Sequence, residues 1–362
     1  MRIDYVITGL EIGGAEYQVV TLLEQLAKRG HQVRLISLTP PSSAIFVDRL
    51  SAAGIPLHGL GMRSGKDLPL ALFRLRRELR RSRPDVVHSH MVHANLLARL
   101  VRLFTPSIKL VCTAHNTHEG GKVRDWAYRL TNPLCQLNTT ISEAATRRFI
   151  SEHVFKVRNT RTIPNGIDTV KFSPGKEHRP ALERPFRWLA VGRLVEQKDY
   201  PTLIAAFSKL SNSQLLIAGQ GPLFETLQRQ VVHAGLEKRI EFLGIRNDID
   251  QLYRHVDGFV LSSEWEGYGL VVAEAMASEL PVVATNSGGP GEIIGNTGEN
   301  GLLVPIKDTE ALARAMASIE MMPLQDRLRL GQYARRRIKE KYDLNEIVTR
   351  WECIYTELKN NN

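Results

Sequence analysis

The sequence predicts an α/β protein made of two doubly wound domains, each a parallel β-sheet covered by helices. Short runs rich in β-branched residues alternate with amphipathic helical stretches, which is typical of parallel sheets with helical crossovers. The alternation starts again after Pro185. A chain of 362 residues also exceeds what one hydrophobic core ordinarily holds, and 43% hydrophobic residues can fill two cores.

The first half of the chain contains five strand-like runs, and a helical stretch at 16–29 separates the first two. These runs are YVITGL at 5–10, QVRLISL at 32–38, DVVHSH at 85–90, KLVCTAH at 109–115 and LNTTIS at 137–142.

The second half repeats the pattern with six strand-like runs and helices expected at 199–210 and 221–234. Its strand-like runs are FRWLAVG at 186–192, QLLIAGQG at 214–221, IEFLGI at 240–245, DGFVLSS at 257–263, LPVVATN at 280–286 and GLLVP at 301–305. A segment rich in proline and charge at 173–185 is the expected linker. We therefore expect domains at 1–172 and 173–344, followed by a last helix at about 345–362.

The segment SEWEGYGLVVAE at 263–274 places two carboxylates, Glu266 and Glu274, on either side of a glycine-containing turn. Gly269 can adopt backbone angles closed to other residues, and Leu270 and Val271 begin an apolar helix. The free N–H groups at a helix start bind phosphate, and carboxylates accept hydrogen bonds from hydroxyls. The segment therefore predicts a site for a diphosphate flanked by sugar hydroxyls. A plain helix-capping role for Glu266 is the alternative.

Two cations, Arg193 and Lys198, follow the strand-like run at 186–192. Fixed cations in a partly dry site stabilise the charge that builds on a departing diphosphate. The alternative is a solvated pair of loop residues. The chain shows no Asp-x-Asp pair after a strand, and Asp248 and Asp250 fit helix capping better, so we expect no metal and no cofactor.

A glycine pair, Gly13 and Gly14, lies between the first strand and the helix expected at 16–29. Without side chains, these residues let a ligand approach the backbone. The alternative is an ordinary turn between a strand and a helix.

Several histidines follow strand-like runs in the first half. His115 lies at the end of the run at 109–115, and His88, His90 and His93 lie in HSHMVH. The last three lack a cysteine or carboxylate at ligand spacing, so packing or acceptor contact is favoured over metal binding.

Five segments together resemble the retaining glycosyltransferases of family 4, which have the GT-B fold. They are GLEIGGAE at 9–16, TAHN at 113–116, PNGID at 164–168, VGRLVEQKD at 191–199 and the segment at 263–274. The resemblance covers nearly the whole chain. It implies two Rossmann-like domains that face each other across a cleft, with the last helix packed back on the first domain.

The resemblance also implies roles for individual residues. Glu274 corresponds to the carboxylate that binds the ribose hydroxyls, and His115 and Glu266 correspond to the catalytic positions beside the transferred sugar. Backbone around Gly244 and Ile245 corresponds to the region that reads the base, uracil by family habit.

These assignments predict a retaining, metal-independent hexosyltransferase. The donor is expected to be a UDP-linked hexose or N-acetylhexosamine. The acceptor is expected to be a hydroxyl of a lipid-linked saccharide in cell-surface polysaccharide or lipopolysaccharide biosynthesis. A nucleotide-sugar epimerase of the same architecture is the alternative enzyme, since fold alone does not fix function.

Charge is distributed unevenly. Residues 1–180 hold 27 Lys and Arg against 14 Asp and Glu, a balance of +13, whereas residues 181–362 hold 21 against 24, a balance of −3. A basic half indicates an anionic partner. A nucleic-acid or membrane-binding module would explain this half but not the paired carboxylates of the other, so we expect no nucleic-acid partner.

The stretch LPLALFRLRRELRRSR at 68–83 places leucines on one helical face and six arginines around it. It is expected either as a solvated helix packed on the domain or as a contact with anionic membrane. No signal peptide or membrane span is visible, and three cysteines without C-x-x-C spacing fit reduced thiols. We therefore expect a cytoplasmic protein associated with the inner face of the membrane.

Overall fold

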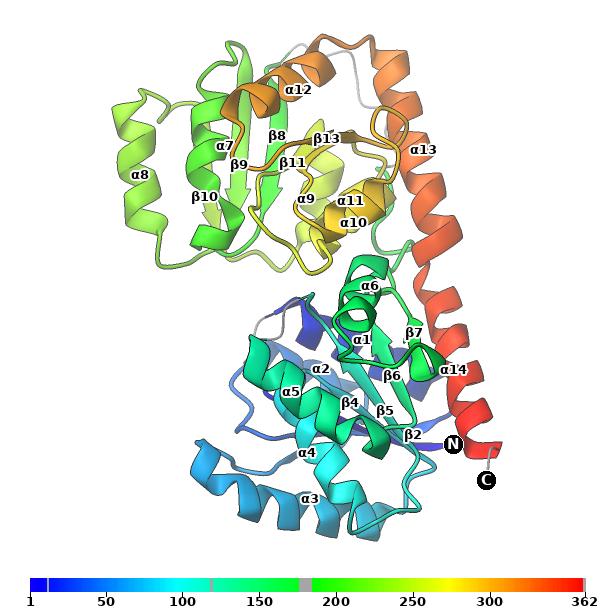
Figure 1. Cartoon of the computed structure of the whole chain (residues 1–362). Helices are drawn as coiled ribbons and strands as arrows, with labels where there is room; N and C mark the ends of the chain where they lie inside the picture. Colours follow the sequence, from blue (N-terminus) through cyan, green and yellow to red (C-terminus); the bar gives the residue numbers. More distant parts are fainter. Residues whose placement is uncertain (12, 118–119, 176–183, 361–362) are drawn as a thin grey trace. The chain divides into compact units, whose positions relative to one another are not determined.

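The computed structural model describes residues 1–11, 13–117, 120–175 and 184–360. The chain divides into two compact units: unit 1 contains Met1–Gly166 and Asn345–Asn362, and unit 2 contains Ile167–Leu344. Each unit is a parallel β-sheet covered by helices (Figure 1), so the predicted pair of doubly wound domains is confirmed. The predicted linker lies mostly at 176–183, outside the described residues. Within the described ranges, no helix is both long enough and apolar enough to cross a membrane.

The sheet of unit 1 has seven strands, all parallel. Its strands are β1 (Arg2–Ile7), β2 (Gln32–Ser37), β3 (Leu57–Gly59), β4 (Val86–His90), β5 (Leu110–Ala114), β6 (Leu137–Thr140) and β7 (Thr160–Thr162). The spatial order is β3-β2-β1-β4-β5-β6-β7, which changes direction between β1 and β4. Side chains at the carboxyl ends of β1, β4 and β5 therefore lie near this change, where ligands of such sheets usually bind.

The helices of unit 1 cover both faces of its sheet. They are α1 (Gly14–Lys28), α2 (Ala44–Ala52), α3 (Leu68–Ser82), α4 (Val92–Arg102), α5 (Lys122–Thr131), α6 (Glu143–Ser151) and α14 (Leu344–Asn360), with single turns of 3₁₀-helix at Gly65–Asp67, Asn132–Leu134 and Val157–Asn159. Because crossovers between parallel strands are right-handed, α1 and α2 lie on one face and α3 to α6 on the other. Helix α3 packs on α4, and α4 packs on α5.

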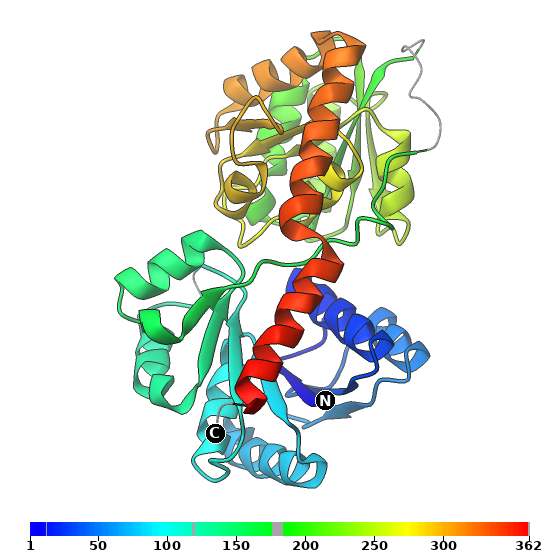
Figure 2. The same cartoon turned by 90° about the vertical axis from the view of Figure 1, so that its right-hand side faces the viewer.

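Helix α14 packs on the sheet of unit 1 through a buried stripe. The hydroxyl of Tyr355 lies 2.6 Å from the hydroxyl of Tyr5 on β1 and 2.7 Å from Nδ1 of His88 on β4. Beside α1, Arg29 donates to a carboxylate oxygen of Glu352 at 2.5 Å. Figure 2 shows α14 beside α1 in this unit. The side of α14 that carries Tyr355 therefore faces the sheet.

The sheet of unit 2 has six parallel strands. They are β8 (Phe186–Val191), β9 (Ser213–Ala218), β10 (Ile240–Gly244), β11 (Gly258–Leu261), β12 (Val282–Thr285) and β13 (Leu302–Val304), in the spatial order β10-β9-β8-β11-β12-β13. The direction changes between β8 and β11, so the loops after these two strands are adjacent at the carboxyl edge.

Seven helices and one turn of 3₁₀-helix, η4 (Glu196–Lys198), complete the described part of unit 2. The helices are α7 (Tyr200–Phe207), α8 (Phe224–His233), α9 (Ile249–His255), α10 (Leu270–Ala277), α11 (Gly289–Ile294), α12 (Thr309–Met321) and α13 (Leu324–Tyr342). Fully buried aromatic side chains such as Trp188 and Phe207 form the core between the sheet and its helices.

The sequence-based boundaries differ from the structure in a few places. Helix α1 begins at Gly14, two residues earlier than expected, and α8 begins at Phe224 instead of residue 221. Gly221 lies in a loop packed so closely that a Cβ there would lie 2.5 Å from the carbonyl oxygen of Leu194. The edge strands β3 and β7, of three residues each, were not predicted because they are too short to show an alternating pattern.

Candidate active site

The loops after β8 and β11 bring together two residues that the sequence placed in separate motifs. Lys198, at the end of η4, forms an ion pair with Oε1 of Glu266. Ser263 Oγ donates to the same oxygen at 2.8 Å. The two charged side chains are only 16% and 9% exposed, so the pair is largely shielded from water. Glu266 is therefore a carboxylate fixed in place by an ammonium and a hydroxyl.

The main chain around Glu266 is clamped by the loop after β12. The N–H of Glu266 donates to the carbonyl of Ser287 at 2.8 Å, and the N–H of Gly289 donates to the carbonyl of Glu266 at 3.2 Å. A Cβ on Gly289 would lie 2.1 Å from the carbonyl oxygen of Tyr268, so only glycine fits there. Close packing of two loops thus fixes the turn that precedes α10.

Helix α10 begins at this clamped turn. Its N-cap, Gly269, has a φ of 90°, in the left-handed region that favours glycine. The N–H groups of Val272 and Ala273 donate to the carbonyl of Gly269. Those of Leu270 and Val271 have no acceptor within the helix, because a helix start leaves its first donors without intrahelical partners. The predicted helix start is confirmed, and phosphate binding by its first N–H groups stays a prediction.

Glu274 lies in the middle of α10 and is buried. The hydroxyl of Tyr253, on α9, lies 3.4 Å from its Oε2 and donates to the carbonyl of Val271 at 3.0 Å. Burial raises the pKa of Glu274 to about 7, and the positive charge of Lys171 opposes part of this rise. The carboxyl therefore keeps its proton to a higher pH than an exposed glutamate does.

The loops after β8, β9 and β10 are joined through backbone hydrogen bonds. Gly192 N donates to the carbonyl of Ala218 at 3.0 Å, and Gly219 N donates to the carbonyl of Gly244 at 2.8 Å. A Cβ on Gly219 would lie 1.9 Å from the carbonyl oxygen of Gly192, so these loops are in direct contact. The Ile245 side chain, next along the chain, is 59% exposed.

Arg193 follows Gly192 on the loop after β8, and its side chain is exposed. The main chain of the next residue is fixed, since Leu194 N donates to the carbonyl of Gln220 at 3.1 Å. The guanidinium is therefore free to reach a ligand from a fixed loop.

In unit 1, His115 follows β5 and is buried. Its Nε2 lies 2.9 Å from Nδ1 of His90, the last residue of β4. Burial lowers the pKa of His115 to about 4, and burial also lowers the pKa of His90 well below its usual value. Both rings are thus neutral at physiological pH, which suits orientation of a ligand and not proton transfer by an imidazolium.

Of the other two histidines of HSHMVH, His88 has a packing role, whereas His93 is exposed. His88 is fully buried between α14 and the sheet, and its Nε2 lies 2.7 Å from Oγ1 of Thr113. Among the described residues, no group of His, Cys, Asp and Glu side chains is arranged to hold a metal ion.

Two of the predicted motifs of unit 1, TAHN and PNGID, meet around a small cavity beside His115. The cavity is lined by Gln18 of α1 and by Pro164 and Asn165 of the PNGID segment. Gln18 Nε2 donates to the carbonyl of Gly166 at 2.6 Å, which ties α1 to that segment. The helix itself begins with Gly13 as its N-cap.

Two capping interpretations were wrong. Glu266 does not cap α10, because its carboxylate binds Lys198 and Ser263 and the N-cap is Gly269. Asp248 is the N-cap of α9, but its side chain pairs with Arg246 at 2.9 and 2.6 Å and makes no capping bond. The adjacent arginine is a stronger partner than the backbone amides because it carries full charge.

Two residues that hold the carboxylates were missed from the sequence. Ser263 stands three residues before Glu266, and an S-x-x-E spacing could have suggested that these side chains meet. Tyr253 lies 21 residues before Glu274 and reaches it only through the packing of α9 on α10.

The large groove between α8 and β10, lined by residues such as Gln228 and Phe242, contains none of the predicted site residues.

Comparison with solved structures identifies the fold. A crystal structure of Anabaena Alr3699/HepE in complex with UDP superimposes with a TM-score of 0.86 over 99% of this chain and 100% of that chain, at 21% identity. The fold is therefore GT-B, which confirms the prediction for the fold class.

Sequence comparison gives the family. The model of Glycosyltransferase Family 4 matches residues 12–171, and the model of Glycosyl transferases group 1 matches residues 176–337. The lipopolysaccharide core biosynthesis glycosyltransferase LpsE of Rhizobium meliloti is 30% identical, over 91% of this chain and 94% of its own length. The Escherichia coli UDP-Gal:alpha-D-GlcNAc-diphosphoundecaprenol alpha-1,3-galactosyltransferase is 29% identical, over 69% of this chain and 70% of its own length. The chain belongs to the group 1 glycosyltransferases.

Proposed function

We propose that this glycosyltransferase transfers a hexose or N-acetylhexosamine from a UDP-linked donor to a hydroxyl of a lipid-linked saccharide, with retention of anomeric configuration and without a metal. The observation that carries the proposal is the shielded Lys198–Glu266 pair beside the start of α10. The donor named for the E. coli relative and the UDP named for the Anabaena structure support the choice of nucleotide. The relatives' roles in lipopolysaccharide and diphosphoundecaprenol chemistry support the acceptor class.

The diphosphate of the donor is proposed to bind at the start of α10. There, the N–H groups of Leu270 and Val271 supply hydrogen-bond donors, and Arg193 and Lys198 supply positive charge. As the sugar departs, these groups stabilise the charge that builds on the diphosphate. An ammonium and a guanidinium would then perform the part that a divalent cation plays in other transferases.

The nucleoside is proposed to bind next to the diphosphate in unit 2. Glu274 accepts hydrogen bonds from the ribose hydroxyls, which requires its ionised form. The base lies against backbone at Gly244 and the exposed side chain of Ile245, where close approach is possible. Gly244 has a φ of 66°, a conformation that favours glycine.

Glu266 is proposed to bind hydroxyls of the transferred sugar through the carboxylate oxygen that Lys198 does not occupy. A carboxylate already bound by an ammonium and a serine hydroxyl is a weak nucleophile. The acceptor is therefore proposed to attack from the face that the diphosphate leaves, and a phosphate oxygen takes the acceptor's proton. The protein supplies positioning and charge, and no covalent sugar–enzyme intermediate forms.

In unit 1, neutral His115 is proposed to hydrogen-bond a hydroxyl of the transferred sugar. His90 fixes the orientation of its ring. Backbone at Gly13 and Gly14, at the start of α1, is proposed to approach the acceptor or the diphosphate.

Turnover assays test this function directly. Purified protein is incubated with UDP-sugars and a lipid-linked saccharide acceptor in EDTA, and the anomeric configuration of the product is read by NMR. We expect acceptor-dependent release of UDP and an α-linked product from an α-linked donor. Donor that isomerises without acceptor would favour the epimerase, and turnover abolished by EDTA would contradict the metal-free mechanism.

A further inference from the structure

Helix α3 presents an outer face that combines exposed apolar and cationic side chains. Leu70 and Phe73 lie on this face and are 49% and 58% exposed. Arg77 and Arg80 lie on the same face of the helix, and both are exposed. The opposite side of α3 is buried against the sheet through residues such as Leu75. The apolar side chains on the outer face therefore have no role in the core.

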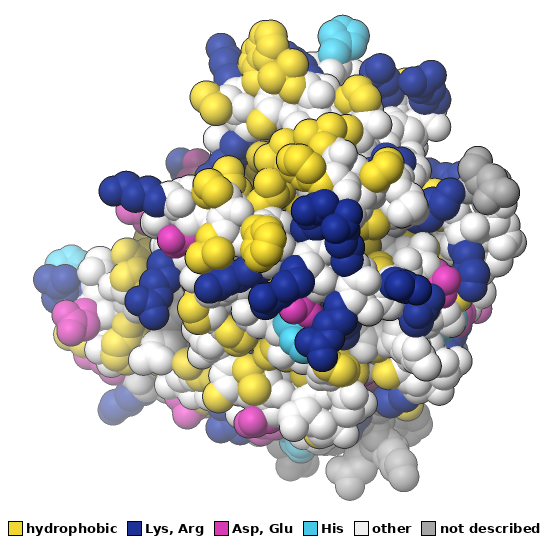
Figure 3. Space-filling view, turned by 90° about the horizontal axis from the view of Figure 1, so that it is seen from below, with side chains coloured by type: hydrophobic (Ala, Val, Ile, Leu, Met, Phe, Trp, Pro, Cys, Tyr) yellow, Lys and Arg dark blue, Asp and Glu magenta, His cyan; other side chains and the backbone are white. Residues whose placement is uncertain are grey.

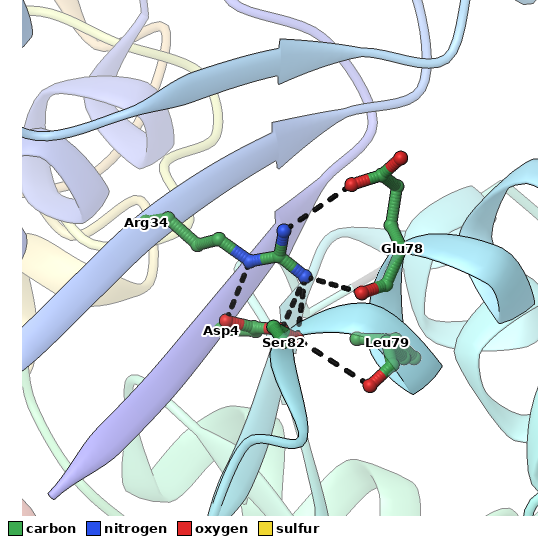
Figure 4. A network of polar contacts seen from close by, with 5 residues as sticks. All are labelled: Asp4, Arg34, Glu78, Leu79 and Ser82. Atoms are coloured by element: carbon green, nitrogen blue, oxygen red, sulfur yellow. Dashed lines mark hydrogen bonds and ion pairs between the residues drawn. The ribbon is translucent and has the colours of Figure 1, made fainter.

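A polar network holds α3 to the sheet from its inner side (Figure 4). Arg34 of β2 donates to Asp4 of β1 with two bonds of 2.7 Å. It also donates to the carbonyl of Glu78 at 2.9 Å and to Ser82 Oγ at 2.7 Å, and its distance to the Glu78 carboxylate is 3.3 Å. The helix is thus fixed in rotation, so its outer face is a defined surface.

The segment after α4 extends the same surface. Leu103 and Phe104 are 58% and 51% exposed. The guanidinium of Arg76, on α3, lies 5.7 Å from the centroid of the Phe104 ring, within the range of a cation–π contact. The two helices therefore join their apolar and basic side chains into one patch.

Helix α5, on the other side of α4, carries a second apolar stripe. Val123, Trp126 and Leu130 recur at the spacing of one helical face, and all three are exposed. Lys122 and Arg129 are exposed on the same helix. This pattern would fit a core helix from the sequence alone, but the structure places these side chains in solvent.

The three helices lie side by side and form one surface, which we name the α3–α5 face. In Figure 1 they lie one below another at the front of unit 1, in agreement with the packing of α3 on α4 and of α4 on α5. Figure 3, seen from the side on which α3 lies in Figure 1, shows hydrophobic side chains grouped among many Lys and Arg. Of the seventeen large hydrophobic side chains exposed in the described ranges, eight lie on these helices or directly after α4, so apolar exposure is concentrated here.

The carboxylates of these helices do not neutralise the α3–α5 face. The structure describes every residue of α3, α4 and α5, and they contain two carboxylates, Glu78 and Asp125. Glu78 faces Arg34 in the inner network, and Asp125 is buried and paired with Arg148, whose Nη1 lies 3.0 Å from it. The outward charge of the face is therefore positive.

We propose that the α3–α5 face binds the surface of an anionic lipid bilayer. Apolar side chains enter the headgroup boundary, and arginines and lysines contact lipid phosphates, as in interfacial amphipathic helices. A nucleic acid would use the cations but gain little from Phe73 and Trp126. A second copy of the same face would bring arginine against arginine. This inference goes beyond the proposed transfer reaction and rests on residues outside the candidate active site.

Vesicle sedimentation tests the proposal with the whole protein. The probes are vesicles of phosphatidylcholine alone and of phosphatidylcholine with phosphatidylglycerol, at low and high salt. We expect binding only to the anionic vesicles, and binding that weakens as salt screens the charges. Absence of binding to anionic vesicles at low salt would overturn the proposal.

Two variants of the face have matched controls in unit 2. The variant R77Q/R80Q/R81Q should bind anionic vesicles about tenfold more weakly or worse. Its control, R314Q/R329Q/R336Q, removes three arginines of α12 and α13 and should bind as the unchanged protein does. The variant F73S/W126S should also lose binding, whereas M321S/Y333S, which removes two exposed apolar side chains, should not. Equal losses of vesicle binding in the variants and their controls would contradict binding through the α3–α5 face.

Two further readouts keep the result interpretable. Bromine-labelled lipids should quench emission from Trp126, and a milder variant, Trp126→Phe, should lose that component. UDP-sugar affinity without lipid should be unchanged in all these variants, so loss of vesicle binding is distinct from failure of the proposed donor site. If the arginine variant lost affinity for double-stranded DNA while F73S/W126S retained vesicle binding, the face would be assigned to nucleic acid instead.

Discussion

Lys198 and Glu266, 68 residues apart in the chain, form an ion pair that joins the loop after β8 to the loop after β11. The pair lies where the strand order of unit 2 changes direction, which is the usual ligand position in such sheets. Lys198 can thus act on a diphosphate and on Glu266 at once. Its removal has consequences both for donor binding and for the loop itself.

Replacement of Lys198 by alanine should weaken donor binding by about 100-fold, because a charge-assisted contact to phosphate is lost in a shielded site. It should also destabilise the protein by about 1–3 kcal/mol, since Glu266 is left without its cation. Calorimetry and denaturant unfolding measure the two effects. The double variant K198M/E266Q should recover part of the stability but none of the donor affinity. Recovery of both by the double variant would contradict a direct role in phosphate binding.

Glu274 should make donor affinity depend on pH. Its pKa is raised by burial to about 7, and only the ionised form accepts two ribose hydroxyls, so affinity should rise with pH through neutrality. Titrations between about pH 6 and pH 8 check this dependence. Glu274→Gln should bind donor weakly at every pH tested. A pH-independent affinity in the unchanged protein would exclude Glu274 from the ribose site.

Glu274 should also lower the free energy of unfolding of the protein at high pH. A carboxyl whose folded-state pKa is raised contributes stability that is complete below its unfolded pKa of 4.5 and is lost as pH rises through about 7. Glu274→Gln should therefore raise the free energy of unfolding at pH 8 by about 1–3 kcal/mol relative to the unchanged protein, with little gain near pH 5. Chemical denaturation at both pH values measures the difference. An equal effect at both would mean that charge at this position does not matter.

His90 should act as a positioning residue for His115. Its Nδ1 lies 2.9 Å from Nε2 of His115, and the pKa values of both rings are lowered by burial. Replacement of His90 by phenylalanine should lower kcat about tenfold to 100-fold with little change in donor affinity. His90→Gln, which retains a hydrogen-bonding group, should restore part of the rate. A rate loss that comes with an equal loss of donor affinity would indicate a purely structural role.

Gly289 should tolerate no side chain. A Cβ there would lie 2.1 Å from the carbonyl oxygen of Tyr268, so Gly289→Ala must displace the clamped turn before α10. We expect a loss of about 1–3 kcal/mol in stability together with loss of donor binding. Gly65→Ala is a matched control, because no atom lies within 4 Å of its added Cβ and its φ is not in the left-handed region. Unfolding curves should show a loss of stability in Gly289→Ala and none in Gly65→Ala.

The sequence predicted the fold well, because the strands and helices that form the cores carry clear periodic patterns. It also predicted the start of α10 at Leu270, since glycine followed by an apolar run marks a helix start. It did not predict β3 and β7, whose three residues each show no alternation. The exposed stripe of α5 could not be predicted either, because Trp126 and its neighbours have the spacing of a buried face.

The candidate site was predicted as single residues and not as contacts. Lys198 and Glu266 were assigned to phosphate and sugar separately, and nothing in their spacing indicates that they pair. His90 is the last residue of β4 and His115 directly follows the adjacent strand β5, so their contact follows from strand order. The contact between Lys198 and Glu266 depends on tertiary packing, which local sequence patterns do not reveal.

Calorimetric titration of a UDP-sugar panel in EDTA tests most directly whether unit 2 binds an activated sugar without a metal. We expect at least one UDP-sugar to bind the unchanged protein, with binding strongly reduced in Lys198→Ala and in Glu274→Gln and unaffected by added magnesium. Binding that requires magnesium, or that survives both substitutions, would contradict the proposed site.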